Sequence, residues 1–406
     1  MDIRALIAST IVILSALTVA GAESRDGSFQ EPQFIQLFVW HDGSACELEP
    51  IQDLVRQYNT THKPYRIVLN HRSTSDAYQR LRAWSGPERA TAPDMVLVPN
   101  AWLSQFKGLL RSLETALSTS QRAVFYPEVL NLFVNAGRLQ AVPWRIGSRC
   151  LVVRTDLLEQ AGLDLPQTWE DVLAAAEKLH NPPDIYGIGL PGRQGGGELL
   201  AEMTWAFGGS LYTEDSYTLA TDASTKALQL CKQLTEFAQP EVLTWSQAEL
   251  EALFAKGHLA MLVTDTWWLQ HAIQRKDLDL QVQMLALPAA EKPVVHLIGE
   301  GLGIINGSSH EKQCLDFVRM VCQSESQAKL LKLGGLPSGP QCGEVSQTDP
   351  VWGALATNVS QSHSLPAQSR QRIFDALQWA LYLSLSGRLD AAGALQSAEQ
   401  VVLSSQ

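Results

Sequence analysis

Tryptophan side chains stand close to carboxylate, amide or guanidinium side chains at several places in this chain. Trp40 lies two residues before Asp42, and Asn100 lies two residues before Trp102. An aromatic ring can stack on the apolar C–H face of a neutral sugar, while carboxylates, amides and guanidinium groups hydrogen-bond with its hydroxyls. These residue types together would suit a surface that binds a neutral sugar. The candidate ligand contacts are Trp40, Asp42, Asn100, Trp102, Trp144, Arg145, Glu202, Trp205, Trp267 and Glu300.

Packing in a hydrophobic core is the alternative interpretation of each tryptophan. The chain has 11 Trp and 11 Phe, although Trp is normally much the rarer residue. Trp169 and Trp379 lie in amphipathic helical patterns, so we expect both in the core. Arg145 has two interpretations as well, because it could bind an acidic sugar or phosphate or form a structural ion pair.

Two carboxylates raise the possibility of catalysis. Glu198 and Glu202 share a helix face at i, i+4, and glycoside hydrolases use paired carboxyl groups. A solvated helix face explains the same spacing.

A glycine motif is the other candidate for chemistry. Residues 187–192 match the dinucleotide pattern G-x-G-x-x-G, but Pro191 and further non-helical residues separate them from the next helix. That motif binds pyrophosphate only where a strand leads directly into a helix N-terminus. We therefore expect no cofactor. Scattered His residues and the lack of a Cys-x-x-Cys pair likewise predict no metal site.

Alternating strands and helices must position these residues. Apolar runs at residues 34–40, 65–70 and 94–98 predict buried strands, separated by helical patterns. Residues 139–143 and 150–153 predict two short strands that flank an irregular segment at 144–148. Thr168 and Asp171 form a capping-box pattern that starts a helix. This order predicts an α/β fold, and ligands in open α/β sheets bind beyond the carboxyl ends of the strands.

Length and composition exclude several classes of protein. The 406 residues suggest two or three domains. The net charge of −11 argues against nucleic acid as a partner, because phosphate-backbone binding needs Lys and Arg. The chain is 45% hydrophobic and 18% charged, as in ordinary globular proteins.

The first residues have the layout of an export signal. An apolar run at 5–19 is followed by small residues at 20–22, so residues 1–22 read as a cleaved signal peptide. The first cysteine, Cys46, lies far beyond that point, so we expect no lipid anchor. The six cysteines allow disulfides or buried thiols, but Cys314 and Cys322 lie too far apart on one predicted helix to be bridged.

Several short motifs, in a consistent order, resemble the extracellular solute-binding proteins of carbohydrate ABC importers, in particular the maltose-binding and glycerol-phosphate-binding branch. The resemblance covers about residues 34 to 400. Its blocks include Ala92-Pro93-Asp94, Val142-Pro143-Trp144, Thr155-Asp156-Leu157-Leu158, the segments 205–209, 254–261 and 299–304, and Gly335-Leu336-Pro337.

The resemblance implies a periplasmic-binding-protein fold with two lobes, each a doubly wound, mostly parallel sheet, joined by a hinge of several crossings. It places the crossings near Ile146, Glu291 and Gln323. The implied division is 23–145 and 292–323 for the first lobe, and 146–291 and 324–406 for the second.

We therefore predict a monomeric periplasmic protein without enzymatic activity. It would capture a sugar or sugar-like osmolyte between the lobes and, by hinge closure, deliver it to an ABC permease and ATPase complex. Two alternatives remain open: a binding protein for a phosphorylated polyol or other charged solute, and a secreted glycoside hydrolase.

Overall fold

Strands and helices alternate along the first lobe as the periodicity predicts. The computed structural model describes residues 31–40, 45–213, 216–274, 280–289, 294–333, 335–343, 359, 362–363 and 365–404. The segment 1–22, predicted to be a signal peptide, and the side chains of Asp42 and Cys46 lie outside the described residues.

The first half of the described chain consists of these elements: β1 (Gln33–Trp40), α1 (Ala45–Thr61), β2 (Tyr65–Arg72), α2 (Thr74–Trp84), η3 (Arg89–Thr91), β3 (Met95–Pro99), η4 (Asn100–Trp102), α3 (Thr119–Arg122), α4 (Pro127–Asn131), β4 (Val134–Asn135), β5 (Arg138–Leu139), β6 (Val142–Arg154), α5 (Thr155–Ala161) and α6 (Trp169–Leu179). The second half consists of α7 (Gly196–Ala206), β7 (Tyr212–Thr213), β8 (Ser216–Tyr217), α8 (Asp222–Leu234), η5 (Thr235–Phe237), η6 (Val242–Thr244), α9 (Gln247–Ala255), β9 (Met261–Asp265), α10 (Thr266–Gln274), β10 (Val282–Leu285), β11 (Leu297–Ile304), α11 (Glu311–Val321), α12 (Ser324–Leu330), η7 (Leu331–Leu333), α14 (Ala367–Leu385) and α15 (Ala391–Leu403).

The sheet of the first lobe has a parallel centre. Strand β1 pairs in parallel with β2 on one side and β3 on the other, with Leu37 opposite both Leu69 and Met95. All three predicted strands of this region are confirmed. Strand β11 returns antiparallel to β3 and brings the sheet to β6. Apolar side chains from these strands and from α1 and α11 form one buried cluster.

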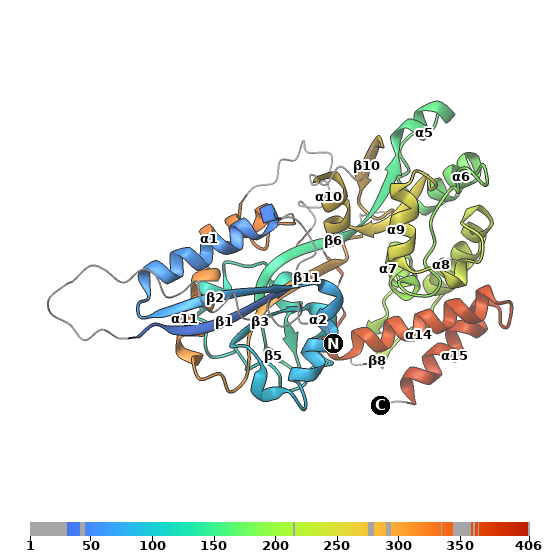
Figure 1. Ribbon diagram of the computed structural model, residues 1–406. Coiled ribbons are helices and arrows are strands. Elements are labelled where there is room, and N and C mark those ends of the chain that lie inside the picture. Colours follow the sequence, from blue (N-terminus) through green and yellow to red (C-terminus); the bar gives the residue numbers. More distant parts are fainter. Residues whose placement is uncertain are drawn as a thin grey trace, which may run out of the picture.

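Strand β6 runs from one lobe into the other (Figure 1). Its first half pairs with β11, and its second half pairs with β9 and β10. The expectation of an irregular segment at 144–148 is therefore wrong, because these residues form the middle of a continuous strand. Pairing with β11 holds residues 145–148 extended, and this tertiary contact overrides the local signals of Pro143 and Gly147.

The second lobe has its own buried cluster, formed largely by α6, α7, α8, α14 and α15. Parallel bridges join Tyr186 to Leu259 and Ile188 to Ala238, so short extended segments continue its sheet beyond β9. The capping box of Thr168 and Asp171 at the start of α6 is confirmed. Two cores joined by a shared strand confirm the two-lobed α/β architecture.

The two tryptophans assigned to helix packing differ. Trp169 is 1% exposed and belongs to the second core, as expected. The expectation for Trp379 is wrong: this side chain is 42% exposed and stacks on the neighbouring Tyr382. A helical pattern defines a face, but whether another element covers that face depends on the tertiary fold.

The region after Gln323 packs differently from the expected third crossing. Leu330, Leu333 and Leu336 belong to the same buried cluster as β1 and β3. The backbone N–H of Leu336 also donates to the carbonyl oxygen of Ile146. Helix α12 therefore continues the first lobe, and the chain does not leave that lobe at Gln323.

The glycine motif at 187–192 has a structural explanation. A Cβ atom added at Gly187 would lie 2.1 Å from the carbonyl oxygen of Ala176 in α6. One added at Gly192 would lie 2.3 Å from the carbonyl oxygen of Val242. Both glycines therefore allow the backbone to pack closely against its neighbours.

The described cysteine side chains are buried free thiols: Cys150, Cys231, Cys314, Cys322 and Cys342. None of the described helices combines the length and apolarity that crossing a membrane requires. Within the described residues, no group of His, Cys, Asp and Glu side chains is arranged to hold a metal ion.

Candidate functional site

A cavity of about 400 Å³ lies where the two lobes meet. Its volume falls in the range of about 300–1,000 Å³ typical of small-molecule sites. The first lobe contributes η4 and the start of β11, while the second contributes α7, α9, α14 and the end of β9. The walls are formed by Asn100, Ala101, Arg149, Gln194, Gly195, Glu198, Gln247, Ala248, Glu251, Asp265, His296, Ile298, Arg370, Gln371 and Phe374.

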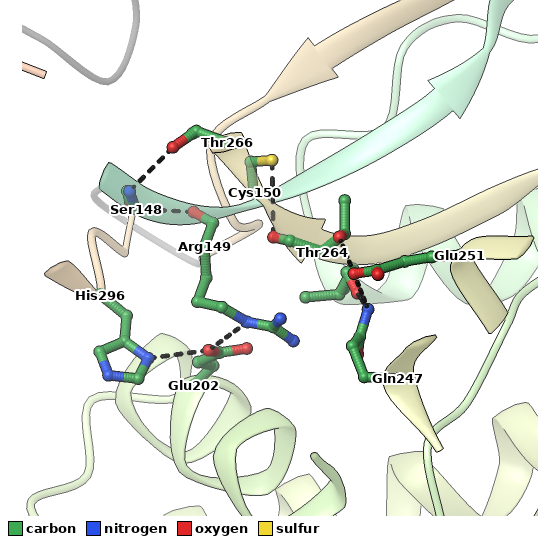
Figure 2. Close-up of polar contacts among 10 residues, drawn as sticks. Ser148, Arg149, Cys150, Glu202, Gln247, Glu251, Thr264, Thr266 and His296 are labelled. Carbon is green, nitrogen blue, oxygen red and sulfur yellow. Dashed lines mark hydrogen bonds and ion pairs between the residues drawn. The ribbon is translucent and has the colours of Figure 1, made fainter. Parts of the chain in front are cut away.

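Arg149, in the cavity wall, forms an ion pair with Glu202, which is buried behind it (Figure 2). The Nε atom of Arg149 donates to Oε1 of Glu202 at 3.1 Å, and Nδ1 of His296 lies 2.8 Å from the same oxygen. Burial opposes the charge of Arg149, but the surrounding carboxylates, Glu202 foremost, outweigh it and raise its pKa. Glu202 thus holds the guanidinium group in place.

One nitrogen of that guanidinium group is left without a hydrogen-bond partner. Nη2 of Arg149 is buried and has no hydrogen-bond partner among the described residues. An unpaired buried donor is costly, on the order of 1–3 kcal/mol. Because Arg149 lines the cavity, a bound molecule with an acceptor oxygen could satisfy this nitrogen.

Three further carboxyl groups line the cavity: Glu198, Glu251 and Asp265. Oε1 of Glu251 accepts hydrogen bonds from Oγ1 of Thr264 at 2.7 Å and from Nε2 of Gln247 at 3.3 Å (Figure 2). Burial, with a further contribution from Asp265, raises the pKa of Glu251 to about 7. Burial also raises the pKa of Glu198. The cavity is therefore rich in carboxyl groups, and the negative charge of Asp265 makes Glu251 harder to ionise.

Arg370 connects the two lobes at the edge of the cavity. Its Nη1 donates to the carbonyl oxygen of Asn100 at 2.9 Å, and its Nη2 donates to the carbonyl oxygen of Leu365 at 2.9 Å. Burial without an acidic partner lowers the pKa of this guanidinium group to about 10. Asn100 in turn accepts from the backbone N–H of Gly299 through its side-chain oxygen.

Three of the ten sequence-predicted ligand contacts lie at or beside this cavity. Asn100 lines it, and Glu202 supports Arg149 from behind. Trp205 is 6% exposed, stacks on His363 at 5.3 Å and meets the edge of His296. Trp205 therefore backs the cavity wall and presents no ring face to the cavity.

Five other predicted ligand contacts form a separate group around Arg145. Arg145 pairs with Glu300 at 3.1 Å and lies over the ring of Trp267 at 4.4 Å. Trp40 and Trp144 are 5% and 2% exposed, and with Arg145 and Glu300 they line a small pocket of about 20 Å³. The structure thus places Trp144 in the core, away from the larger cavity.

Of the remaining two predicted contacts, Trp102 is not part of the cavity wall. Trp102 packs edge-on against Tyr78 in the first lobe. Asp42 lies outside the described residues.

Several cavity residues were not predicted from the sequence, above all Arg149, Glu251, Asp265 and Arg370. A signal existed for Arg149: it stands four residues after Arg145, so a single strand over 142–154 puts both on one face of the sheet. No comparable signal marks Arg370, because its contact with Asn100 spans 270 positions of the chain.

The geometry argues against Glu202 as the catalytic carboxyl group of a glycoside hydrolase. Glu202 is fully buried, and its Oε1 is bound by Arg149 and His296. A catalytic carboxyl group must reach the scissile bond of the substrate, which this one cannot do without breaking the ion pair.

A polar cavity between two lobes that share hinge strands defines a protein of the two-lobed ligand-binding class. A family model described as bacterial extracellular solute-binding protein matches residues 53–357. The chain belongs to this family, whose members are binding proteins of transporters rather than enzymes.

The relatives agree with this assignment. A probable ABC transporter-binding protein of Deinococcus radiodurans is 23% identical over 349 residues, which is 80% of this chain and 83% of the relative. Among solved structures, an ABC transporter solute-binding protein from Thermotoga lettingae bound with α-D-tagatose superposes with a TM-score of 0.76 at 19% identity. The match covers 92% of this chain and 99% of the Thermotoga chain.

A second solved structure is similar to the same degree. The cyclic α-maltosyl-1,6-maltose binding protein of Arthrobacter globiformis also has a TM-score of 0.76, at 20% identity, and the match covers 91% of this chain and 98% of that one. These similarities confirm the two-lobed periplasmic-binding-protein fold.

Proposed function

We propose that this chain is the solute-binding component of an ABC importer and that it captures a sugar or sugar-like polyol between its lobes. The observation that carries the proposal is the cavity of about 400 Å³, with polar side chains from both lobes around it. Carboxylates, amides and guanidinium groups suit hydroxyl groups of a sugar, and Phe374 supplies an aromatic surface. The ligands of the two structural neighbours, tagatose and a cyclic maltosyl-maltose, support the same class of solute.

Hinge closure would couple binding to delivery. Strands β6 and β11 run along the junction, and Arg370 joins the lobes where the cavity ends. A ligand held by both lobes stabilises the closed arrangement, which the permease and ATPase complex would then recognise.

The division of the chain belongs to the proposal. We assign 23–145 to the first lobe together with residues from about 297 to 343, because α11 and α12 pack on its core. The second lobe takes 147–296 and 365–406. Residues 1–22 serve as a cleaved export signal, and the mature protein is a periplasmic monomer without a lipid anchor.

A phosphorylated polyol is a weaker candidate ligand. Arg145, which such a ligand would need, is paired with Glu300 and does not line the large cavity. Three carboxyl groups line that cavity instead, and they would repel a phosphate.

Binding and closure can be measured on the mature chain. Isothermal titration with neutral monosaccharides, disaccharides, amino sugars, polyols and sugar phosphates should detect at least one sugar or polyol. Small-angle scattering should show a smaller radius of gyration with that ligand present. If no sugar or polyol binds, or only sugar phosphates do, the proposed function is wrong.

A further inference from the structure

The cavity carries three carboxyl groups that form no ion pair with a cation among the described residues. Among the described residues, no Lys, Arg or His lies within ion-pairing distance of Glu198, Glu251 or Asp265, and Arg149 interacts with them only at longer range. Arg149 is already paired with Glu202, and Arg370 is bonded to two backbone carbonyl oxygens. Among the described lining residues, three carboxyl groups therefore face two guanidinium groups that already have hydrogen-bond partners.

These carboxyl groups lie near one another. Thr264 donates to Glu251 and directly precedes Asp265, and the charge of Asp265 makes ionisation of Glu251 harder. The three side chains are half-buried, and like charges held close together in such a place cost the protein free energy. A bound cation would remove that cost.

A second observation points to the other half of the ligand. Arg149 is 8% exposed, lines the same cavity, and its Nη2 has no hydrogen-bond partner. This donor needs an acceptor oxygen, such as a sugar hydroxyl or ring oxygen. A small molecule that carries both an acceptor oxygen and a positive charge would therefore match the side chains of this cavity.

We propose that the solute is a carbohydrate with a protonated amine, an amino sugar, whose ammonium group faces Glu198, Glu251 and Asp265 while an oxygen accepts from Arg149. This inference rests on the proposed function, and it names the substrate class of that same site. An ammonium group donates up to three hydrogen bonds, and charge-assisted bonds are about twice as strong as neutral ones.

The test uses matched pairs of ligands with the mature full chain at pH 7. Glucose, galactose and mannose are each compared with their 2-amino and 2-acetamido counterparts, together with the corresponding β-1,4-linked disaccharides, by isothermal titration. We expect at least one amine to bind ten or more times tighter than both its hydroxyl and its acetamido partner. Lowering the pH to 5 should reduce this preference, since it protonates Glu251.

The preference for the amine should depend on the carboxyl groups. In Glu251→Gln and Glu198→Gln the ratio of amine to hydroxyl affinity should fall at least fivefold. Glu236→Gln, an exposed carboxyl group elsewhere in the second lobe, is the control and should leave the ratio unchanged. Thermal melting establishes that each variant is folded.

The outcomes separate this inference from the proposed function. If neutral or acetylated sugars bind as tightly as the amines, the amino-sugar inference is overturned while the sugar-binding function stands. If no member of any pair binds, both are overturned. An amine preference that survives in both carboxamide variants also overturns the inference, because the charge would then be recognised elsewhere.

Discussion

The guanidinium group of Arg370 donates a 2.9 Å hydrogen bond to the backbone carbonyl oxygen of Asn100, and this bond joins the two lobes. Arg370 stands near the start of α14, whose Leu377 is buried in the second core. Asn100 begins η4, which leads into Leu103 of the first core. The contact spans the edge of the cavity, so opening the lobes must break it.

Removing this donor should favour the open form. Arg370→Met keeps much of the side-chain volume but loses a charged hydrogen bond worth about 1.5–3 kcal/mol. We expect ligand affinity to fall at least tenfold by isothermal titration, and the radius of gyration of the unliganded protein to increase. Arg388→Met, at an exposed position after the same helix, is the control. Unchanged affinity and scattering would show that the bond does not help hold the lobes together.

The central strands of the first lobe follow directly from the sequence, because their apolar runs are local. Strand β6 does not: Pro143 and Gly147 read as loop signals, and only pairing with β11 on one side and with β9 further along makes the segment continuous. Short-range patterns record propensity, whereas a hinge strand is specified by its neighbours.

The site was harder to predict than the fold for the same reason. The sequence marked tryptophans after strands as ring platforms, yet Trp40 and Trp144 are buried in the first core. Residue type alone does not tell a sugar platform from a core residue. Arg149, Glu251 and Asp265 come from three elements that converge only in the folded second lobe, so no spacing along the chain identifies them.

The ion pair of Arg149 and Glu202 should matter for stability because both groups are buried. In Glu202→Gln the guanidinium group loses its main counter-charge, and breaking such a pair costs about 3–5 kcal/mol. Chemical denaturation should show this loss. A double variant, Arg149→Met with Glu202→Met, should regain much of the stability while losing ligand affinity. A single variant as stable as wild type would mean that the pair is not needed for folding.

Stability should also depend on pH through Glu251. Its folded pKa of about 7 exceeds the ordinary value of 4.5, because of burial and Asp265. Between these values the folded protein binds more protons than the unfolded chain, so the contribution of Glu251 to stability decreases as pH rises. The unfolding free energy of wild type minus that of Glu251→Gln should therefore fall by roughly 2–3 kcal/mol between pH 4.5 and 8. Arg149 partly offsets the effect by favouring the charged form. Parallel pH profiles of the two proteins would contradict a raised pKa.

Trp144 should act through the core rather than through the ligand. Its side chain is 2% exposed and borders two small pockets of about 10 and 20 Å³ among the described residues. Replacing a large buried aromatic residue by alanine costs about 3–5 kcal/mol, since it removes burial and leaves a cavity. Trp144→Ala should therefore melt at a clearly lower temperature, whereas Trp379→Ala, at a 42% exposed position, should stay close to wild type. The milder variant Trp144→Phe separates the two roles: we expect it to bind ligand within threefold of wild type. If Trp144→Phe keeps its melting temperature but binds ligand ten times more weakly, Trp144 contacts the ligand after all, and the ligand reaches beyond the 400 Å³ cavity toward Arg145 and Trp267.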